Sequence, residues 1–356
     1  MEAGKEYDKT FNNLQTITRN QLHNYPHMST KRYVKLLIKS TLKRKNLINN
    51  DKFFWPNGLL AISLEWSYRN NKNKENLFSL KKYYNKWIKK GTLLRNTDYA
   101  INGYSLIYLY NITKSKKYLK AIQLLIDYLK NQKRTEIGSI PYRVNNPNQV
   151  FVDSLGMICP FLCRYGKTFN DDTSIDLAIN QLTNFLKYGM DKKSYLPYHG
   201  YDSHNNIKLG IIGWGRANGW LLIGLVDSLE FIPKSHNKYQ YLCDEFNNIV
   251  SNIIKHQRED GNFAWQITAK EGHIDTSSTS MICYAIRRGI MLGILPKSYL
   301  ENTNLALDTL HKNIVDGSVQ NCSAECRGLG MYPQKYSSYP WAQGPTTSLT
   351  AISIEY

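Results

Sequence analysis

Apolar residues recur along most of this chain at the three-and-four spacing of helices, and few stretches alternate strictly as strands do. The pattern predicts an all-helical chain without convincing strands, although a piece such as residues 263–265 is suited to a short hairpin in a loop. The predicted helices span residues 31–46, 57–71, 75–90, 100–113, 116–131, 152–165, 171–189, 216–231, 237–256, 276–292, 297–314 and 345–355.

The predicted helices are of two kinds, which alternate along the chain. Lysine-rich segments such as SKKYLKAIQLLIDYLKNQ have one apolar stripe and one polar face, as surface helices do. The others, such as RANGWLLIGLVDSL, are apolar nearly all round and are expected to be buried on both sides. Alternating inner and outer helices, with a repeat of about 50 residues, predict an (α/α)6 toroid, a ring of six inner and six outer helices.

An open solenoid is the alternative to a closed ring, and it would need polar terminal repeats. The last segment, PWAQGPTTSLTAISIEY, is as apolar as the inner helices, which favours closure. We therefore predict a single catalytic domain over residues 31–356. Residues 1–30 are polar and are expected to form a partly irregular arm.

Loops rich in aromatic, polar and glycine residues precede the inner helices. All inner helices of an up-and-down ring start at the same end, so these loops are expected to meet at one mouth. Aromatic rings suit the C–H faces of sugars, and helix N-termini favour an anion. Simple packing of the loops is the alternative role for each ring. The aromatic residues expected at the mouth are Trp55, Tyr99, Trp214, Trp220 and Trp341.

Two aspartates, Asp98 and Asp153, stand just before inner helices. Aspartate is common as a helix N-cap, so a structural role is the alternative for each. Two carboxyl groups at one mouth also suit acid/base chemistry. Asp153 is the better candidate, because apolar neighbours such as Phe151 and Leu155 favour the protonated form that can donate a proton.

Other polar residues are expected at the same mouth. Arg216 begins an inner helix and is suited to pair with a carboxylate. His199 and His204 lie in the preceding loop, where His199 is a candidate for substrate contact and a solvent-facing role is the alternative. Asp202 and Asp275 are expected to be loop or cap residues.

The formal net charge of +18 admits two explanations. It suits an anionic partner such as an acidic polysaccharide, or it reflects a composition rich in Lys, Asn, Ile and Tyr. The lysines are scattered in pairs and no nucleic-acid motif occurs, so we expect no nucleic-acid partner.

Cysteine spacing and hydropathy exclude further classes of protein. The six cysteines include no C-x2-C pair, which argues against a zinc site and predicts free thiols in a reducing compartment. The sequence has no apolar run long enough to span a membrane, and MEAGKEYDKTFNNLQ lacks the apolar segment of a secretion signal. We expect a cytoplasmic protein, monomeric or homodimeric, unless a signal was removed.

Several motifs together resemble a known enzyme family. They are NTDYAINGYSL, FVDSLGMICPFL, YHGYD, WGRANGW, DTSSTSM and PWAQG. In order and spacing over residues 50–356, they are similar to the unsaturated glucuronyl and rhamnogalacturonyl hydrolases of glycoside hydrolase families 88 and 105. The resemblance implies the same (α/α)6 toroid that the periodicity predicts.

The resemblance also implies a reaction. Such enzymes remove a 4,5-unsaturated uronic acid from the non-reducing end of acidic oligosaccharides by hydrating its vinyl ether, without a metal or organic cofactor. By the motif match, Asp153 would protonate the double bond and assist the addition of water, while Asp98 would orient the substrate or tune Asp153. The uronate subsite would be lined by His199, Trp214, Arg216, Asn218 and Trp220.

Two departures from the family pattern affect the expected subsite. Ala217 stands where the family often has glycine, and Asp275 where it often has glutamate. Two other functions stay open. One is a conventional glycosidase with Asp98 and Asp153 as an acid/base pair, which could invert if their carboxyl groups are roughly 6.5–9.5 Å apart. The other is a non-catalytic sugar-binding protein of a bacterial polysaccharide pathway.

Overall fold

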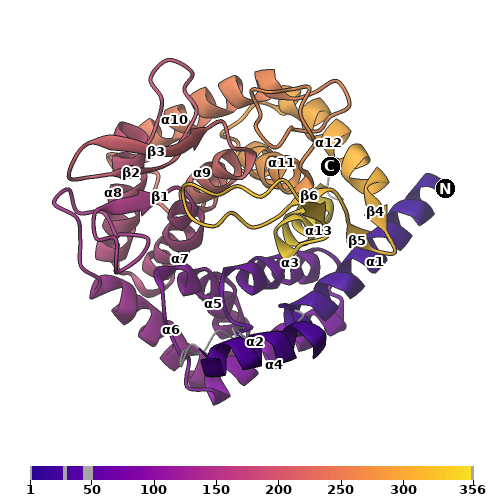
Figure 1. The fold of residues 1–356 in the computed structure, drawn as a ribbon, viewed down its shortest axis with the longest axis horizontal. Coiled ribbons are helices and arrows are strands. Elements are labelled where there is room, and N and C mark those ends of the chain that lie inside the picture. Colours follow the sequence, from indigo (N-terminus) through magenta and orange to yellow (C-terminus); the bar gives the residue numbers. More distant parts are fainter. Residues whose placement is uncertain (1, 27–29, 43–50, 354–356) are drawn as a thin grey trace.

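A computed structural model describes residues 2–26, 30–42 and 51–353, and within these ranges two concentric rings of helices form the body of the protein (Figure 1). The inner helices are α3 (Trp55–Asn71), α5 (Asn102–Thr113), α7 (Asp153–Phe169), α9 (Gly215–Leu229), α11 (Thr276–Met291) and α13 (Pro340–Ser353). The outer helices are α1 (Glu2–Asn24), α4 (Lys74–Lys89), α6 (Lys116–Lys130), α8 (Asp172–Tyr188), α10 (Tyr239–Ile253) and α12 (Leu300–Lys312). Each inner helix packs against the next, and α13 packs against α3, so the predicted (α/α)6 toroid is confirmed.

Hydrophobic patterning explains which helices are inner. Every residue of α9 is buried, as expected of an apolar helix between the ring axis and the outer layer. Outer helix α6 instead buries one stripe of residues spaced three or four apart. That stripe is Tyr118, Ala121, Ile122, Leu125, Ile126 and Leu129.

The N-terminal helix α1 closes the ring, which corrects the expectation of a partly irregular arm for residues 2–24; residues 1 and 27–29 of that prediction lie outside the described residues. Helix α1 packs against α3 and α13, and its Thr18 Oγ1 lies 2.9 Å from Thr347 Oγ1 of α13. The prediction was wrong because the buried face of α1 is partly polar: Gln15 and Thr18 are both fully buried. Their partners lie on other helices, so the local hydrophobic pattern understates the burial.

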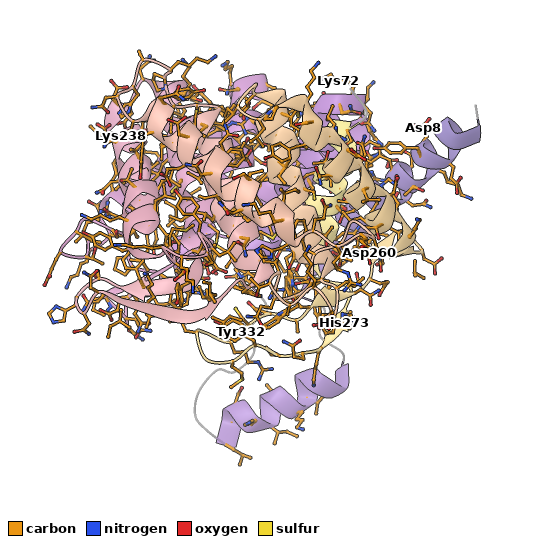
Figure 2. All side chains as sticks on the ribbon, turned by 90° about the horizontal axis from the view of Figure 1, so that it is seen from above. Asp8, Lys72, Lys238, Asp260, His273 and Tyr332 are labelled. Atoms are coloured by element: carbon orange, nitrogen blue, oxygen red, sulfur yellow. The ribbon has the colours of Figure 1, made fainter. Side chains whose placement is uncertain are left out.

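Helix α2 (Thr30–Leu42) matches the first predicted helix, residues 31–46, but it is not part of either ring. Figure 2 shows it standing apart, at the same end of the molecule as Tyr332. Its side chains Val34, Leu37, Ile38 and Leu42 are exposed. Residues 43–46 of the prediction lie outside the described residues.

Short strands occur in the loops. A three-stranded antiparallel sheet joins β1 (Gln149–Phe151), β2 (Tyr198–Asp202) and β3 (Ile207–Ile212). The sequence did not predict it, because the burial of β2 and β3 does not alternate as the pattern of a half-buried strand requires. Two-stranded pairs join β4 (Ile314–Val315) to β5 (Ser318–Val319) and β6 (Cys322–Ser323) to β7 (Tyr336–Ser337).

The remaining elements are three 3-10 helices, η1 (Thr97–Ile101), η2 (Ile254–His256) and η3 (Lys297–Tyr299). The extended piece predicted at residues 263–265 is confirmed: Ala264 pairs with Ile274 in an isolated bridge. All six cysteines are unpaired, and five are buried. In the described part of the chain, no helix combines the length and apolarity needed to cross a bilayer.

The loop between β6 and β7, residues 324–335, runs across the centre of the ring (Figure 1). We call it the crossing loop. It lies at the end where the inner helices begin, which is the predicted mouth.

Candidate active site

Strand pairing brings Asp153 and His199 together. Strand β1 runs almost directly into α7, whose first residue is Asp153. Strand β2 pairs with β1 so that Phe151 is opposite Gly200, and the Val152 N–H donates to the His199 carbonyl over 2.9 Å. This register places His199 Nε2 3.0 Å from Asp153 Oδ2.

Asp153 is not a capping residue. Val152 occupies the N-cap position of α7, and the capping alternative therefore fails. The Asp153 side chain keeps 12% of its surface exposed, whereas that of His199 keeps 1%. Although His199 is close, the angle is poor for a hydrogen bond, and among the described residues Asp153 Oδ2 has no aligned donor. A mostly buried carboxyl group that keeps a small opening is suited to exchange a proton with a bound ligand.

The imidazole of His199 is fixed from several sides. Its ring centroid lies 4.5 Å from that of Trp214 and 5.2 Å from that of Phe151. Its Nδ1 lies 2.8 Å from the Tyr332 hydroxyl of the crossing loop. Gly210 makes this approach possible, because a Cβ atom there would lie 2.6 Å from that hydroxyl. His199 is therefore held between two aromatic rings and one hydroxyl.

Asp98 lies in η1, where Asn96 is the N-cap, so the capping alternative fails here too. Arg143 Nη2 donates to Asp98 Oδ2 over 3.0 Å, while Oδ1 has no partner among the described residues. Burial raises the pKa of Asp98 above its usual value, and the Arg143 charge opposes this rise. The Arg143 guanidinium lies 4.0 Å from the centroid of the Tyr142 ring.

A stacked aromatic pair connects the two carboxylates. Tyr142 stacks on Phe151 with a centroid distance of 4.6 Å and an interplanar angle of 17°. Phe151 in turn precedes Asp153 by two positions, and Tyr142 precedes Arg143, the partner of Asp98. Tyr142 also interacts electrostatically with both Asp98 and Asp153, so the stacked pair lies close to both carboxyl groups.

The terminal nitrogens of Arg216 are occupied by the chain itself. Nη1 donates to the Ser323 carbonyl over 3.0 Å, and Nη2 donates to the Ala324 carbonyl over 2.8 Å. Ser277 Oγ and Ser323 Oγ are further acceptors for Nη1, and Asp275 Oδ2 lies 3.7 Å away. Arg216 thus holds the root of the crossing loop, and its contact with a uronate stays a prediction.

The predicted aromatic residues fall into two groups. Trp55 lies 5.8 Å from Trp220 and 5.2 Å from Trp341 between ring centroids, and Trp341 Nε1 donates to the Ser323 carbonyl. Trp214 lies apart from this cluster, beside His199 and under the Arg216 guanidinium. Because Trp214, Trp220 and Trp341 are each 1% exposed, packing accounts for their positions, and direct sugar contact stays a prediction.

Two predicted ligand residues make internal hydrogen bonds. The Tyr99 hydroxyl donates to Asp51 Oδ2. Asn218 Nδ2 donates to the Trp214 carbonyl over 2.8 Å, while its Oδ1 has no partner among the described residues. Their substrate contacts are therefore predictions that rest on the motif alone.

Asp202 and Asp275 are loop and cap residues as expected, whereas His204 takes the solvent-facing alternative. Asp275 is the N-cap of α11, where it accepts from the Ser277 N–H. Asp202 accepts two N–H groups of the turn between β2 and β3. His204 is exposed and lies 3.5 Å from Glu136, so it is a surface residue.

Sequence reasoning missed Arg143, Tyr332 and Glu325. Arg143 stands in a loop that the sequence did assign to the mouth, but Tyr332 and Glu325 lie on the crossing loop, whose path depends on the whole ring. Glu325 is exposed, although neighbouring groups remove part of the water around its carboxyl group and so raise its pKa. The Arg216 charge and a hydrogen bond from Trp55 act in the opposite direction and lower it. No local pattern marked either residue of the crossing loop.

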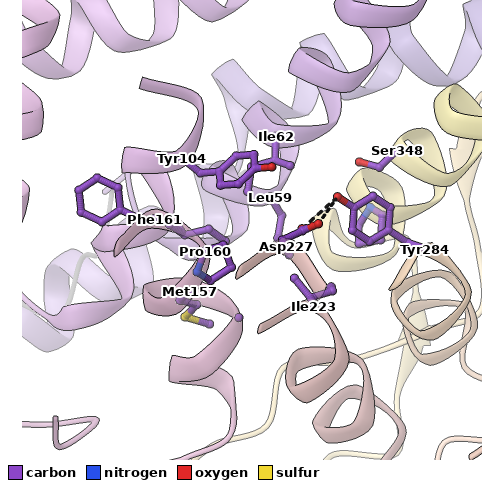
Figure 3. A pocket seen from close by; sticks show the side chains of 13 residues that line it. Leu59, Ile62, Tyr104, Met157, Pro160, Phe161, Ile223, Asp227, Tyr284 and Ser348 are labelled. Atoms are coloured by element: carbon purple, nitrogen blue, oxygen red, sulfur yellow. Dashed lines mark hydrogen bonds between the residues drawn. The ribbon is translucent and has the colours of Figure 1, made fainter. Parts of the chain in front are cut away.

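A separate cavity of about 20 Å³ lies between the inner helices, lined mainly by apolar side chains (Figure 3). Its polar wall includes Asp227, to which the Tyr284 hydroxyl donates over 3.0 Å and Arg288 Nε over 3.2 Å. Burial raises the pKa of Asp227 to about 6. Asp227 is near the C-terminus of α9, about 18 Å along the helix from the mouth at a rise of 1.5 Å per residue.

A ring of helices whose mouth holds two buried carboxyl groups among aromatic side chains is suited to an enzyme that acts on a carbohydrate. The chain belongs to glycosyl hydrolase family 88, whose family model matches residues 29–354. It is a glycoside hydrolase.

Known proteins of similar sequence and structure agree. The unsaturated rhamnogalacturonyl hydrolase YesR of Bacillus subtilis (strain 168) is 24% identical over 303 residues, which cover 82% of this chain and 86% of YesR. A family 105 glycoside hydrolase of C. acetobutylicum ATCC 824 has a TM-score of 0.74 at 25% identity, covering 91% of this chain and 99% of that one. A possible family 105 member from Klebsiella pneumoniae has a TM-score of 0.87 at 18% identity, covering 99% and 93%.

Proposed function

We propose that this glycoside hydrolase removes a 4,5-unsaturated uronic acid from the non-reducing end of acidic oligosaccharides, with Asp153 as the general acid and base. The names of two relatives support this substrate class: YesR is an unsaturated rhamnogalacturonyl hydrolase, and a Formosa agariphila relative, 23% identical over 317 residues, is an unsaturated 3S-rhamnoglycuronyl hydrolase. The observation that carries the proposal is the partly open Asp153 carboxyl beside the buried His199 imidazole.

In the proposed reaction, the protonated Asp153 donates its proton to C4 of the double bond. Positive charge then develops at C5, next to the ring oxygen, and water adds there. The Asp153 carboxylate takes the proton that this water loses, so the residue returns to its starting form and one water is consumed. The product is a hemiketal, which opens and releases the rest of the oligosaccharide.

Two positively charged features of the mouth suit a uronate. Arg143 keeps 36% of its side-chain surface exposed while it pairs with Asp98, so it has N–H groups left for a ligand carboxylate. Helix α7 also begins at Asp153, and its N-terminus favours a negative charge at the mouth.

The test is Asp153→Asn, which keeps the shape of the side chain and removes the acid. We expect hydration of a lyase-treated acidic oligosaccharide, followed as loss of the ultraviolet absorbance of its conjugated double bond, to fall by about 10²- to 10⁴-fold. Asp172→Asn, at an exposed position in the first turn of α8, is the matched control and should keep full activity. Full activity of folded Asp153→Asn would remove Asp153 from the mechanism.

A conventional glycosidase is the second candidate, because burial raises the pKa of Asp98 and so favours the form that donates a proton. In that reaction Asp98 and Asp153 would divide the acid and base roles. Turnover of saturated oligosaccharides at a rate equal to that of unsaturated ones would select this candidate, and failure to cleave them would exclude it.

A further inference from the structure

We propose that Tyr332, on the crossing loop, is a positioning residue that fixes the proton of the neutral His199 ring on Nε2, where it faces Asp153. The inference rests on the proposed function of Asp153. Tyr332 acts through the His199 imidazole and needs no contact with the reacting atoms.

The geometry forms a chain of three groups. The Tyr332 hydroxyl lies 2.8 Å from His199 Nδ1, and His199 Nε2 lies 3.0 Å from Asp153 Oδ2. A neutral imidazole carries one proton, so whichever nitrogen accepts from its neighbour leaves the other as the donor. The direction of the Tyr332 hydrogen bond therefore decides what His199 presents to Asp153.

The surroundings of Tyr332 favour its hydroxyl as the donor in this pair. Burial raises the pKa of Tyr332 well above its ordinary value, so the phenol keeps its proton at neutral pH. The backbone N–H of Ile211 also interacts with its oxygen, which occupies an acceptor site and leaves the O–H directed elsewhere. His199 Nδ1 then accepts, and the proton lies on Nε2, the ring nitrogen that is 3.0 Å from Asp153 Oδ2.

This arrangement bears on the proton cycle of Asp153. When Asp153 has given its proton to the substrate, its new carboxylate lies next to the N–H of His199. A small rotation of either side chain aligns a charge-assisted hydrogen bond, which stabilises the carboxylate at that step. Without the Tyr332 hydroxyl, the imidazole is free to carry its proton on Nδ1 and to present a lone pair to Asp153.

Other titratable groups around Asp153 do not take over this role. Tyr142, from the loop before β1, and Cys326, from the crossing loop, both interact electrostatically with Asp153. Burial raises the pKa of Tyr142 well above its usual value and that of Cys326 to about 12, so both stay protonated at neutral pH. Arg216, at the start of α9, keeps its charge and faces Trp214.

The kinetic test is Tyr332→Phe, which keeps the ring and removes only the hydroxyl. We expect kcat to fall about tenfold with KM within about twofold, because the loss concerns the proton cycle rather than binding. Tyr336→Phe, on the adjacent strand β7, removes a hydroxyl bonded only to Gln334 in the described residues and is the matched control.

A spectroscopic test needs no turnover and so separates this inference from the proposed function. The ring nitrogens of ¹⁵N-labelled His199, assigned by comparison with His199→Gln, should show the Nε2–H form in the wild type and in Tyr336→Phe. Tyr332→Phe should show a shift toward the Nδ1–H form. An unchanged tautomer in Tyr332→Phe, or a wild type already in the Nδ1–H form, would overturn the positioning role even if the chain hydrates unsaturated substrates. A change confined to KM would do the same, since it would make Tyr332 a wall of the binding site.

Discussion

Asp227 offers a direct test of how burial controls charge inside the ring. It is fully enclosed near the C-terminal end of α9, where Tyr284 and Arg288 contact its carboxylate. The change is Asp227→Asn, which keeps the shape of the side chain and removes its ionisation. Arg288 stays paired, because its Nη2 lies 2.6 Å from Glu230 Oε2. The variant therefore leaves no isolated buried cation.

The magnitude follows from the raised pKa. The folded-state pKa of Asp227 is about 6 against an ordinary value of 3.8, a difference of about 2 units. At 1.36 kcal/mol per unit, this corresponds to about 3 kcal/mol. Because the folded value is the higher one, this stabilisation is complete below about pH 4 and is lost as the pH rises through about 6. The asparagine variant lacks this dependence.

The assay is the free energy of unfolding in urea, measured from pH 4 to pH 7 for both proteins. The stability of the wild type relative to Asp227→Asn should fall by up to about 3 kcal/mol across this range. Asp244→Asn, at an exposed position in α10, should follow the wild-type curve throughout. Parallel curves for the wild type and Asp227→Asn would refute the reasoning, since they would mean that burial does not hold the proton on Asp227.

Two further predictions concern the chain's internal contacts. Arg216→Lys keeps the charge but loses the two-pronged contacts with the Ser323 and Ala324 carbonyls. We therefore expect faster trypsin cleavage in the crossing loop and a lower kcat. Unchanged cleavage with only a raised KM would instead support direct uronate binding. Gln343→Leu removes the hydrogen bonds that the Gln343 amide donates to the Gly317 and Leu14 carbonyls. We expect the free energy of unfolding to fall by about 2–4 kcal/mol. A fall below about 1 kcal/mol would contradict this account of ring closure.

The periodicity of the sequence was sufficient for the fold because an inner and an outer helix differ in a local property, the width of the apolar face. Helix α1 is the exception. Its buried Gln15 and Thr18 are polar, and Thr18 finds its partner on α13 at the opposite end of the chain. The hydrophobic pattern of one helix carries no information about a partner on another helix. The first outer helix was therefore predicted at the segment of α2 and not at α1.

The candidate site shows the same limit more strongly. Asp153 stood out as a candidate in the sequence because its apolar neighbours and its place before a helix are local features. Its relation to His199 depends on the register between β1 and β2, two strands that the sequence pattern did not predict. Arg216 was predicted as a ligand from its charge and position, but its charge is used within the chain by acceptors on β6 and the crossing loop.

The crossing loop ties the chemistry to the closure of the ring. Its root at Ser323 is bound by Arg216 and Asp275, and Tyr332 further along it reaches His199. These two contacts, at Ser323 and at Tyr332, are the anchors of the crossing loop, and both lie near the beginning of inner helices. Residues between the anchors, such as Gly328, Gly330 and Met331, are exposed. Substitutions between the anchors therefore change what the mouth admits without moving the hydroxyl that orients His199. Substitutions at the anchors act on Asp153 itself, through the imidazole, even though none of these side chains needs to touch the substrate.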